Sequence, residues 1–360
     1  MRASLTLPLL RMSGGVLLGL ALVAARHTDL VVSAFTVRQS SSTNSKRTAP
    51  LFVLQEKITG EEINNRLQSQ LIKLKEKDAQ SIALSPEDVD VVHEDDDIIV
   101  VNKPAGVLTV PSAAGIPSLA QAVFERCQSS SGLGLAKFDQ MVVHRLGMDT
   151  SGLVVFAKTI DAVRGLNALF RTRKITRQYE CLVAGHVEKE QGLINLPLMR
   201  DYEHPPFMRV STPEHQAALV DLDPSVVGKK LLEAEKASVT HYQVQSRETW
   251  NGDESLPVTR LTLTSITGRT HQLNVHCAAF GHPIVADSVY GFGGDAASNG
   301  GLDEETLRET APDRASDELQ KSLQSATSAS NVNMCVHAKS IRFLHPVTGE
   351  DFSCSSAPPF

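Results

Sequence analysis

Residues 142–159 read VVHRLGMDTSGLVVFAKT and join a charged loop to an apolar run. The run at 153–157 (LVVFA) is short and rich in β-branched residues, which predicts a strand. Helix signals follow at 160–170, and a further strand is predicted at 178–184. This stretch therefore predicts a strand, a helix and a strand in succession, preceded by the polar loop 144–150.

The regions around this stretch continue the mixture of helix and strand. Residues 89–110 predict two strands around an acidic turn, closed by a Pro-Gly break at 104–106. Residues 257–267 alternate apolar and polar residues as a strand does, and residues 271–280 predict a helix. The elements do not follow a strict βαβ alternation, so the expected fold class is α+β.

Residues 1–55 have the composition of a targeting presequence, with six basic residues against one acid. The apolar run at 15–25 has the length of a signal-peptide core and is short for a membrane span. The acid-poor, Ser- and Thr-rich stretch that follows is typical of a transit peptide. This order resembles the bipartite presequence of secondary plastids, and we expect plastid import. A secreted protein, a signal anchor and a mitochondrial presequence are the alternatives.

Two further segments are distinguished by composition. Residues 56–87 predict an N-terminal helical extension, in which a helix over 58–77 begins with a capping box of Thr59 and Glu62. Residues 88–360 form the main domain. Within it, residues 293–333 contain eight acids and three bases among many Gly, Ser and Ala residues. They predict a solvated, partly disordered, acidic low-complexity insertion with a short helix near 303–309, or alternatively an acidic docking segment for a protein partner.

Composition and missing motifs exclude several classes of protein. The formal net charge of −6 confines any nucleic-acid site to a local basic patch. Five scattered cysteines without a CxxC pair indicate neither a zinc knuckle nor a disulfide framework. No GxSxG, P-loop or GxGxxG motif is present. His271 and His276 are five residues apart, which is not the spacing of a helical zinc pair, so we expect no metal and structural hydrogen bonds instead.

Residues 171–179 (RTRKITRQY) place four cations in seven residues ahead of Tyr179. Cations bind phosphate, and an aromatic face can stack on a base. This segment therefore predicts a nucleic-acid contact, although by itself it also fits a solvated basic face.

Together, five ordered segments resemble the RluA-type pseudouridine synthases, which act on uridines in ribosomal or transfer RNA. They lie at 91–112, 142–159, 169–187, 263–291 and 336–359. The resemblance implies a mixed, mainly antiparallel sheet flanked by helices, with an RNA-binding cleft. It also implies RNA and not DNA as the partner, no cofactor, no metal and no membrane attachment of the mature form. We expect a monomer.

The resemblance also implies the reaction, in which the uridine N1–C1′ bond breaks, the base rotates and C5 rejoins the sugar. An essential carboxylate acts as nucleophile or base, a neighbouring arginine keeps it ionised, and Tyr179 corresponds to the tyrosine that packs on the base. The residues expected to bind RNA are His144, Arg145, Thr150, Ser151, Arg171, Arg173, Lys174, Arg269, His271 and Gln272.

Two positions depart from the family pattern. Gly147 stands where the catalytic aspartate is expected, and Asn274 stands where its arginine partner is expected. The loss of both the aspartate and its arginine partner leaves no buried, unpaired charge, as expected of an active site that no longer catalyses a reaction. Asp149, two residues further on, is the candidate substitute, with a solvent-facing or helix-capping acid as the alternative. Three hypotheses follow: an active synthase on plastid rRNA or tRNA, a catalytically inactive RNA-binding paralogue serving as an RNA chaperone or ribosome-assembly factor, and a scaffold that acts through the acidic insertion.

Overall fold

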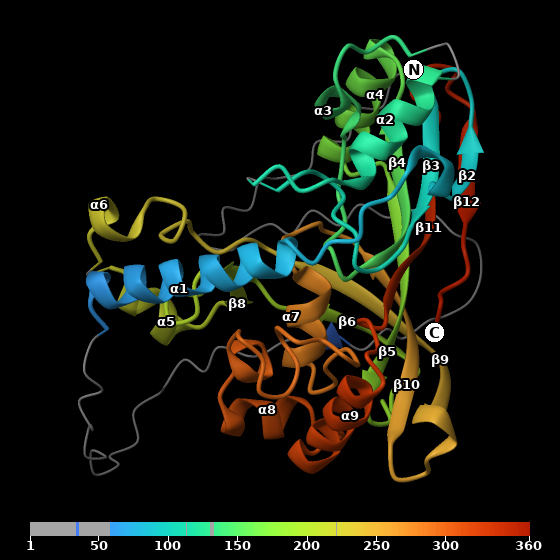
Figure 1. Cartoon of the computed structure of the whole chain (residues 1–360). Helices are drawn as coiled ribbons and strands as arrows, with labels where there is room; N and C mark the ends of the chain where they lie inside the picture. Colours follow the sequence, from blue (N-terminus) through green and yellow to red (C-terminus); the bar gives the residue numbers. More distant parts are fainter. Residues whose placement is uncertain (1–33, 36–57, 113, 130–132, 221) are drawn as a thin grey trace, which may run out of the picture. The chain divides into compact units, whose positions relative to one another are not determined.

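The computed structural model describes residues 34–35, 58–112, 114–129, 133–220 and 222–360, which contain a ten-stranded sheet (Figure 1). The strands pair in the order β1-β6-β9-β10-β5-β11-β4-β3-β2, and β12 pairs with β11. All of these pairs are antiparallel except β1 with β6 and β11 with β4. The strands are β1 (Ala34–Phe35), β2 (Val91–Glu94), β3 (Ile98–Lys103), β4 (Ser151–Ala157), β5 (Thr176–Ala184), β6 (Gln191–Asn195), β9 (Val239–Thr249), β10 (Pro257–Ser265), β11 (Val336–Leu344) and β12 (Asp351–Ser355), while β7 (Leu198–Arg200) and β8 (Met208–Val210) form a separate pair. This confirms the α+β class.

The helices flank the sheet in two groups (Figure 1). Helices α3 and α4 contact β4 near one end of the strand order, whereas α9 contacts β5 and α7 contacts β9. The helices are α1 (Gly60–Asp78), α2 (Leu119–Ser129), α3 (Phe138–Met141), α4 (Ile160–Arg171), α5 (Pro213–Leu219), α6 (Pro224–Val227), α7 (Gln272–Ala279), α8 (Glu304–Thr310) and α9 (Asp317–Ala329), with short 3₁₀ turns η1 (Pro86–Asp88), η2 (Trp250–Gly252) and η3 (Ser298–Gly301). None of the helices within the described ranges is both long and apolar enough to cross a membrane.

Strands β3 and β4 are covered on both faces, which explains their nearly continuous apolar sequences. Val154 and Phe156 face the larger core cluster, and Val155 and Ala157 face a second cluster that includes α4. Successive side chains of a strand point to opposite faces, so a strand between two cores needs apolar residues at every position. The predicted strand at 153–157 is confirmed and begins two residues earlier, at Ser151.

The start of β4 requires a glycine at 152. Gly152 has φ +110°, and a Cβ atom there would lie 2.5 Å from both the backbone N and the O of Ala338. The parallel register pairs Gly152 with Ala338 and Ser151 with His337. Ser151 Oγ and His337 Nδ1 are hydrogen-bonded at 2.9 Å. The Thr-Ser-Gly part of the quoted stretch is thus where the loop 144–150 is fastened to the sheet.

The predicted N-terminal helix is confirmed as α1, with the reciprocal capping box of Thr59 and Glu62 in place. Ile63 is buried and packs with Tyr202, Val227 and Leu231. The helix is therefore docked on the domain. The presequence prediction falls, apart from Ala34 and Phe35, on residues outside those that the structure describes.

The prediction of a solvated, partly disordered segment at 293–333 is wrong. The segment contains η3, α8 and α9, and the expected short helix near 303–309 is α8. Leu307 and Leu323 are buried, and Leu323 packs with Leu182 and Val258 of the sheet. The prediction from composition was wrong because several of these acids cap helices or form ion pairs. For example, Asp303 caps α8 by accepting a hydrogen bond from the backbone N–H of Thr306.

Candidate active site

The loop 144–150 is held by Lys103, the last residue of β3. The buried Lys103 Nζ donates to the carbonyl oxygens of Pro104, Val107 and Met148 at 2.9, 2.7 and 2.9 Å. Burial lowers the pKa of Lys103 to about 7, and the nearby Asp149 carboxylate opposes this shift. The Asn-Lys-Pro motif therefore fixes the backbone immediately before Asp149.

Asp149 lies at a cavity of about 330 Å³. Its Oδ2 is 2.5 Å from Lys77 Nζ at the end of α1, and the side chains of Lys77 and Asp149 are 34% and 30% exposed. The cavity is also lined by Asp287, Ser288 and residues of α9. Asp149 is thus neither a helix cap nor a fully solvent-facing acid, since it is half-buried and paired with a cation.

Gly147 is exposed, and its backbone does not require glycine. Its φ lies outside the left-handed region, and a Cβ atom added there would meet Thr150 Oγ1 at an ordinary contact distance of 3.5 Å. A Cβ atom at 147 would therefore fit without strain.

Asp287 is a second acid of the cavity, which the sequence argument did not single out. Asn274 Nδ2 donates to Asp287 Oδ2 at 2.8 Å, and Oδ1 accepts from the backbone N–H groups of Val289 and Tyr290 at 2.9 Å each. Burial raises the pKa of Asp287, and the charge of Asp149 acts in the same direction. In the sequence, Asp287 could have been noticed through its position in the segment 263–291, which resembles the family.

Three of the residues that were expected to contact RNA are engaged inside the protein, beginning with the buried Gln272. Gln272 donates to Val239 O and Thr240 Oγ1 and accepts from Thr267 Oγ1 and the Arg269 N–H. Because both ends of this amide are bonded within the protein, direct contact of Gln272 with RNA is contradicted.

Ser151 and His144 are also used internally. Ser151 is bonded to His337, as described above, and His144 Nε2 accepts from the Val155 N–H at 3.0 Å. Burial, followed by the charge of Arg177, lowers the pKa of His144 to about 3, so its ring is neutral at pH 7. Both side chains therefore hold the loop to the sheet. His276 is likewise structural, since it bonds Thr240 Oγ1 and Leu196 O.

The basic segment lies against the loop. The His144 ring packs on Phe170 with ring centroids 4.9 Å apart, and the Arg177 guanidinium lies 5.7 Å from the centre of the same Phe170 ring. On the loop and in the basic segment, four exposed cations have no side-chain hydrogen bond or ion pair to any other described residue: Arg145, Arg171, Arg173 and Lys174. Their charges are free to meet phosphates.

The N-terminal end of α7 brings further groups to the loop. His271, in the left-handed conformation with φ 51°, is bonded through Nδ1 to Tyr290 Oη at 2.8 Å. Burial lowers the pKa of His271 to about 4, and the charges of Arg200, Arg145 and Lys77 add to this effect. His271 therefore shares one electropositive neighbourhood with Arg145 and Lys77.

Three other predicted residues are placed as follows. Arg269 donates through Nε to Ala237 O at 3.3 Å and lines a second cavity of about 190 Å³. The Thr150 N–H donates to the Gly147 carbonyl at 3.2 Å, which closes the turn of the loop. Tyr179 on β5 is 7% exposed and packs in the same core cluster as Leu146.

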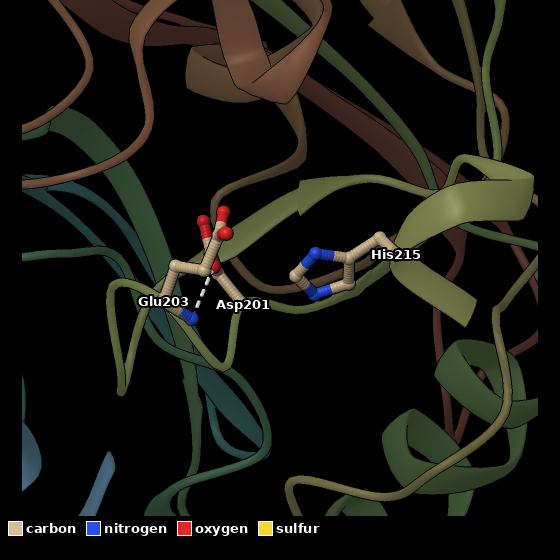
Figure 2. Close-up of side chains that lie close together, drawn as sticks. All are labelled: Asp201, Glu203 and His215. Carbon is tan, nitrogen blue, oxygen red and sulfur yellow. Dashed lines mark hydrogen bonds between the residues drawn. The ribbon is translucent and has the colours of Figure 1, made fainter. Parts of the chain in front are cut away.

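A polar cluster outside this site is formed by Asp201, Glu203 and His215 (Figure 2), each with one potential ligand atom within 4.8 Å of the others. Arg209 Nη1 lies 3.1 Å from Glu203 Oε2, and His204 Nδ1 lies 3.2 Å from Asp201 Oδ2. Burial, followed by the charge of Arg209, lowers the pKa of His215 to about 4. The positive charge of Arg209 would repel a cation bound here, so we assign the cluster a structural role.

Two solved human structures have a similar fold. The human RNA pseudouridylate synthase domain containing 1 matches with a TM-score of 0.52 and 24% identity, covering 78% of this chain and 87% of that chain. The human RNA pseudouridylate synthase domain containing 4 matches with a TM-score of 0.51 and 21% identity, covering 75% and 88%. At these identities the likeness establishes the fold, which is that of pseudouridylate synthases.

Sequence relatives establish the family. A dual-specificity RNA pseudouridine synthase RluA of Pasteurella multocida is 33% identical over 272 residues, covering 76% of this chain and 94% of its own length. The ribosomal large subunit pseudouridine synthase D of the same organism is 32% identical over 263 residues, covering 73% and 65%. Residues 97–279 match the family described as RNA pseudouridylate synthase. The chain belongs to this family and is an RluA-type RNA pseudouridine synthase.

Proposed function

We propose that this enzyme converts uridine to pseudouridine in ribosomal or transfer RNA and that Asp149 is its essential carboxylate. The observation that carries the proposal is the position of Asp149, which is the acid of the loop 144–150 and faces a cavity while paired with a cation. Two relatives are named as a dual-specificity RNA enzyme and a ribosomal large subunit enzyme, which supports this class of substrate.

The geometry leaves Asp149 able to react. Its Oδ2 is bonded to Lys77, whereas Oδ1 has no hydrogen-bond partner among the described residues. An ionised carboxylate with one free oxygen can serve as nucleophile or base toward a uridine that has been flipped out of its stack. The exposed Arg145 on the same loop supplies positive charge for the RNA backbone.

Asp287 is less suited to this task. Both of its oxygens already accept hydrogen bonds from the protein, and burial raises its pKa. A carboxyl group in this state favours the protonated form more than a free aspartate does, and it has no oxygen left without a partner. We therefore assign Asp287 the role of holding Asn274 and the chain that follows it.

The test is tritium release from rRNA and tRNA transcripts that contain [5-³H]uridine, because forming the C5 glycosidic bond expels the C5 hydrogen. The full chain is expected to release tritium, and Asp149→Asn is expected to abolish release while it still binds RNA. Asp96→Asn, an exposed acid in the turn between β2 and β3, is the matched control and is expected to keep full activity.

Other outcomes are informative. Full release by Asp149→Asn would reject Asp149 as the essential group. Tight RNA binding by the wild type without any release would favour the non-catalytic RNA-binding hypothesis that Gly147 and Asn274 raise.

We further propose that the enzyme acts in a plastid, on the basis of the acid-poor, hydroxyl-rich composition of residues 1–55. A fluorescent protein carrying residues 1–55 is expected to enter the plastid of an alga with a secondary plastid. Accumulation in mitochondria would support the alternative presequence, and secretion would contradict import into either organelle.

A further inference from the structure

The last turn of α1 reaches the candidate active site from the N-terminal extension. Lys77 Nζ lies 2.5 Å from Asp149 Oδ2 and 3.4 Å from Ser288 Oγ, 72 and 211 residues away along the chain. The helix that carries Lys77 lies outside the family match at 97–279. A contact to the loop 144–150 therefore comes from a segment outside the residues 97–279 that match the family.

Contacts along the whole of α1 fix the position of Lys77. Near the start, Ile63 is buried, and Arg66 Nη1 donates to the carbonyl oxygen of Glu203 at 3.0 Å. In the middle, Lys73 Nζ and Gln70 Nε2 donate to Asp295 Oδ1 at 2.9 and 3.3 Å. A helix held at several points presents its terminal side chain at a defined place, which a free tail does not.

Positions 274 and 103, which lie close to this site, do not supply a cation that bonds Asp149. Asn274, at the position where the family resemblance expects an arginine, is neutral and donates to Asp287. Lys103 lies close by, but its three donors match the three backbone carbonyls that they already bond. Lys77 is the cation whose ammonium group directly bonds Asp149 within the described part of the chain.

We propose that Lys77 is a positioning residue for Asp149 and replaces, from α1, the arginine that is absent from position 274. Its bond to Oδ2 holds the carboxylate in one orientation at the cavity and leaves Oδ1 without a hydrogen-bond partner among the described residues. Relative to the family pattern, both members of the ion pair then occupy new positions. The acid lies two residues further along the loop, and the cation lies on the N-terminal extension and not on α7. This inference rests on the proposed function.

The test compares three variants of the full chain in the tritium-release assay, with kcat and KM measured separately. Lys77→Met is expected to lower kcat on the order of tenfold with KM within about twofold of the wild type, since the lost contact positions the reacting group. Lys77→Arg keeps the charge and the reach, and is expected to recover most of the loss. Lys75→Met removes the same charge from an exposed position on the same helix and is the matched control, with unchanged kcat.

The outcomes separate this inference from the function on which it rests. An inactive wild type would overturn both. An active wild type with Asp149→Asn inactive and Lys77→Met at full kcat would overturn the role of Lys77 alone. A rise in KM without a fall in kcat would show that Lys77 contacts RNA and does not position Asp149. Thermal melting of each variant checks folding, and a folded Lys77→Arg that rescues kcat supports the proposal even if Lys77→Met is destabilised.

Discussion

Gly152→Ala is expected to be severely destabilising, although it adds a single methyl group. The new Cβ atom would lie 2.5 Å from the N and O atoms of Ala338 and 2.8 Å from its carbonyl carbon. All three are backbone atoms of β11, so no side-chain rotation can relieve the clash. The φ of +110° is also a conformation that residues with a Cβ atom rarely adopt.

The cost can be estimated from two contributions. The backbone conformation costs an alanine about 1–3 kcal/mol. Separating β4 from β11 by even a few tenths of an ångström weakens the pairing at Ser151 and Gly152 and the Ser151–His337 bond, at about 0.5–1.5 kcal/mol for each hydrogen bond lost. Together these lower the free energy of unfolding by about 3–5 kcal/mol, which for a domain of this size corresponds to a fall in Tm of roughly 10 °C.

Chemical denaturation of the wild type and the variant measures this difference directly. Gly147→Ala is the matched control, because it adds the same methyl group five residues earlier, in the loop before β4, with 3.5 Å to Thr150 Oγ1 and an unstrained backbone. It is expected to change the free energy of unfolding by about 0.5 kcal/mol or less. Equal effects of the two substitutions would refute the reasoning, since they would show that the β4–β11 contact does not set the cost.

Three further predictions concern RNA binding, the acidic segment and the altered ion pair. Replacing Arg145 and Lys174 together by alanine is expected to weaken RNA binding and to reduce the slope of log affinity against log salt by about two, because both are exposed cations; unchanged anisotropy titrations would reject this RNA site. Leu323→Ala is expected to lower the free energy of unfolding by about 2–4 kcal/mol because its side chain is buried against the sheet, and a neutral effect in urea melts would mean that α9 is not docked. Gly147→Asp combined with Asn274→Arg is expected to raise tritium release above that of the wild type, since position 147 has room for a side chain; a folded double variant without any gain would show that the cleft has diverged at other positions as well.

Much of the fold could be predicted from local sequence patterns. The strand at 153–157, the helix at 160–170 and the capping box at Thr59 depend on side-chain periodicity and on contacts between residues three or four apart, so they can be read without the tertiary fold. The prediction for the acidic segment 293–333 was wrong because the structure of this segment depends on contacts with the rest of the fold. Its composition suggested a solvated chain, but a few apolar residues at the right spacing, such as Leu307 and Leu323, are sufficient to dock its helices.

The candidate site was predicted in part. The sequence pointed to the loop 144–150, to Asp149 and to the two departures at Gly147 and Asn274. It did not separate the exposed Arg145 from the buried Gln272, because a shared motif does not say which of its side chains face inward.

The sequence by itself determined the family and the residue types of the loop 144–150, since these are encoded in short, ordered motifs. The tertiary structure alone decided which distant residues meet: Lys77 with Asp149, Asn274 with Asp287, and Ser151 with His337. Such pairs are separated by 13 to 186 residues and are brought together by strand pairing and helix docking. Local propensity carries no information about contacts at that range, so the contact between Lys77 and Asp149 became visible only in the folded chain.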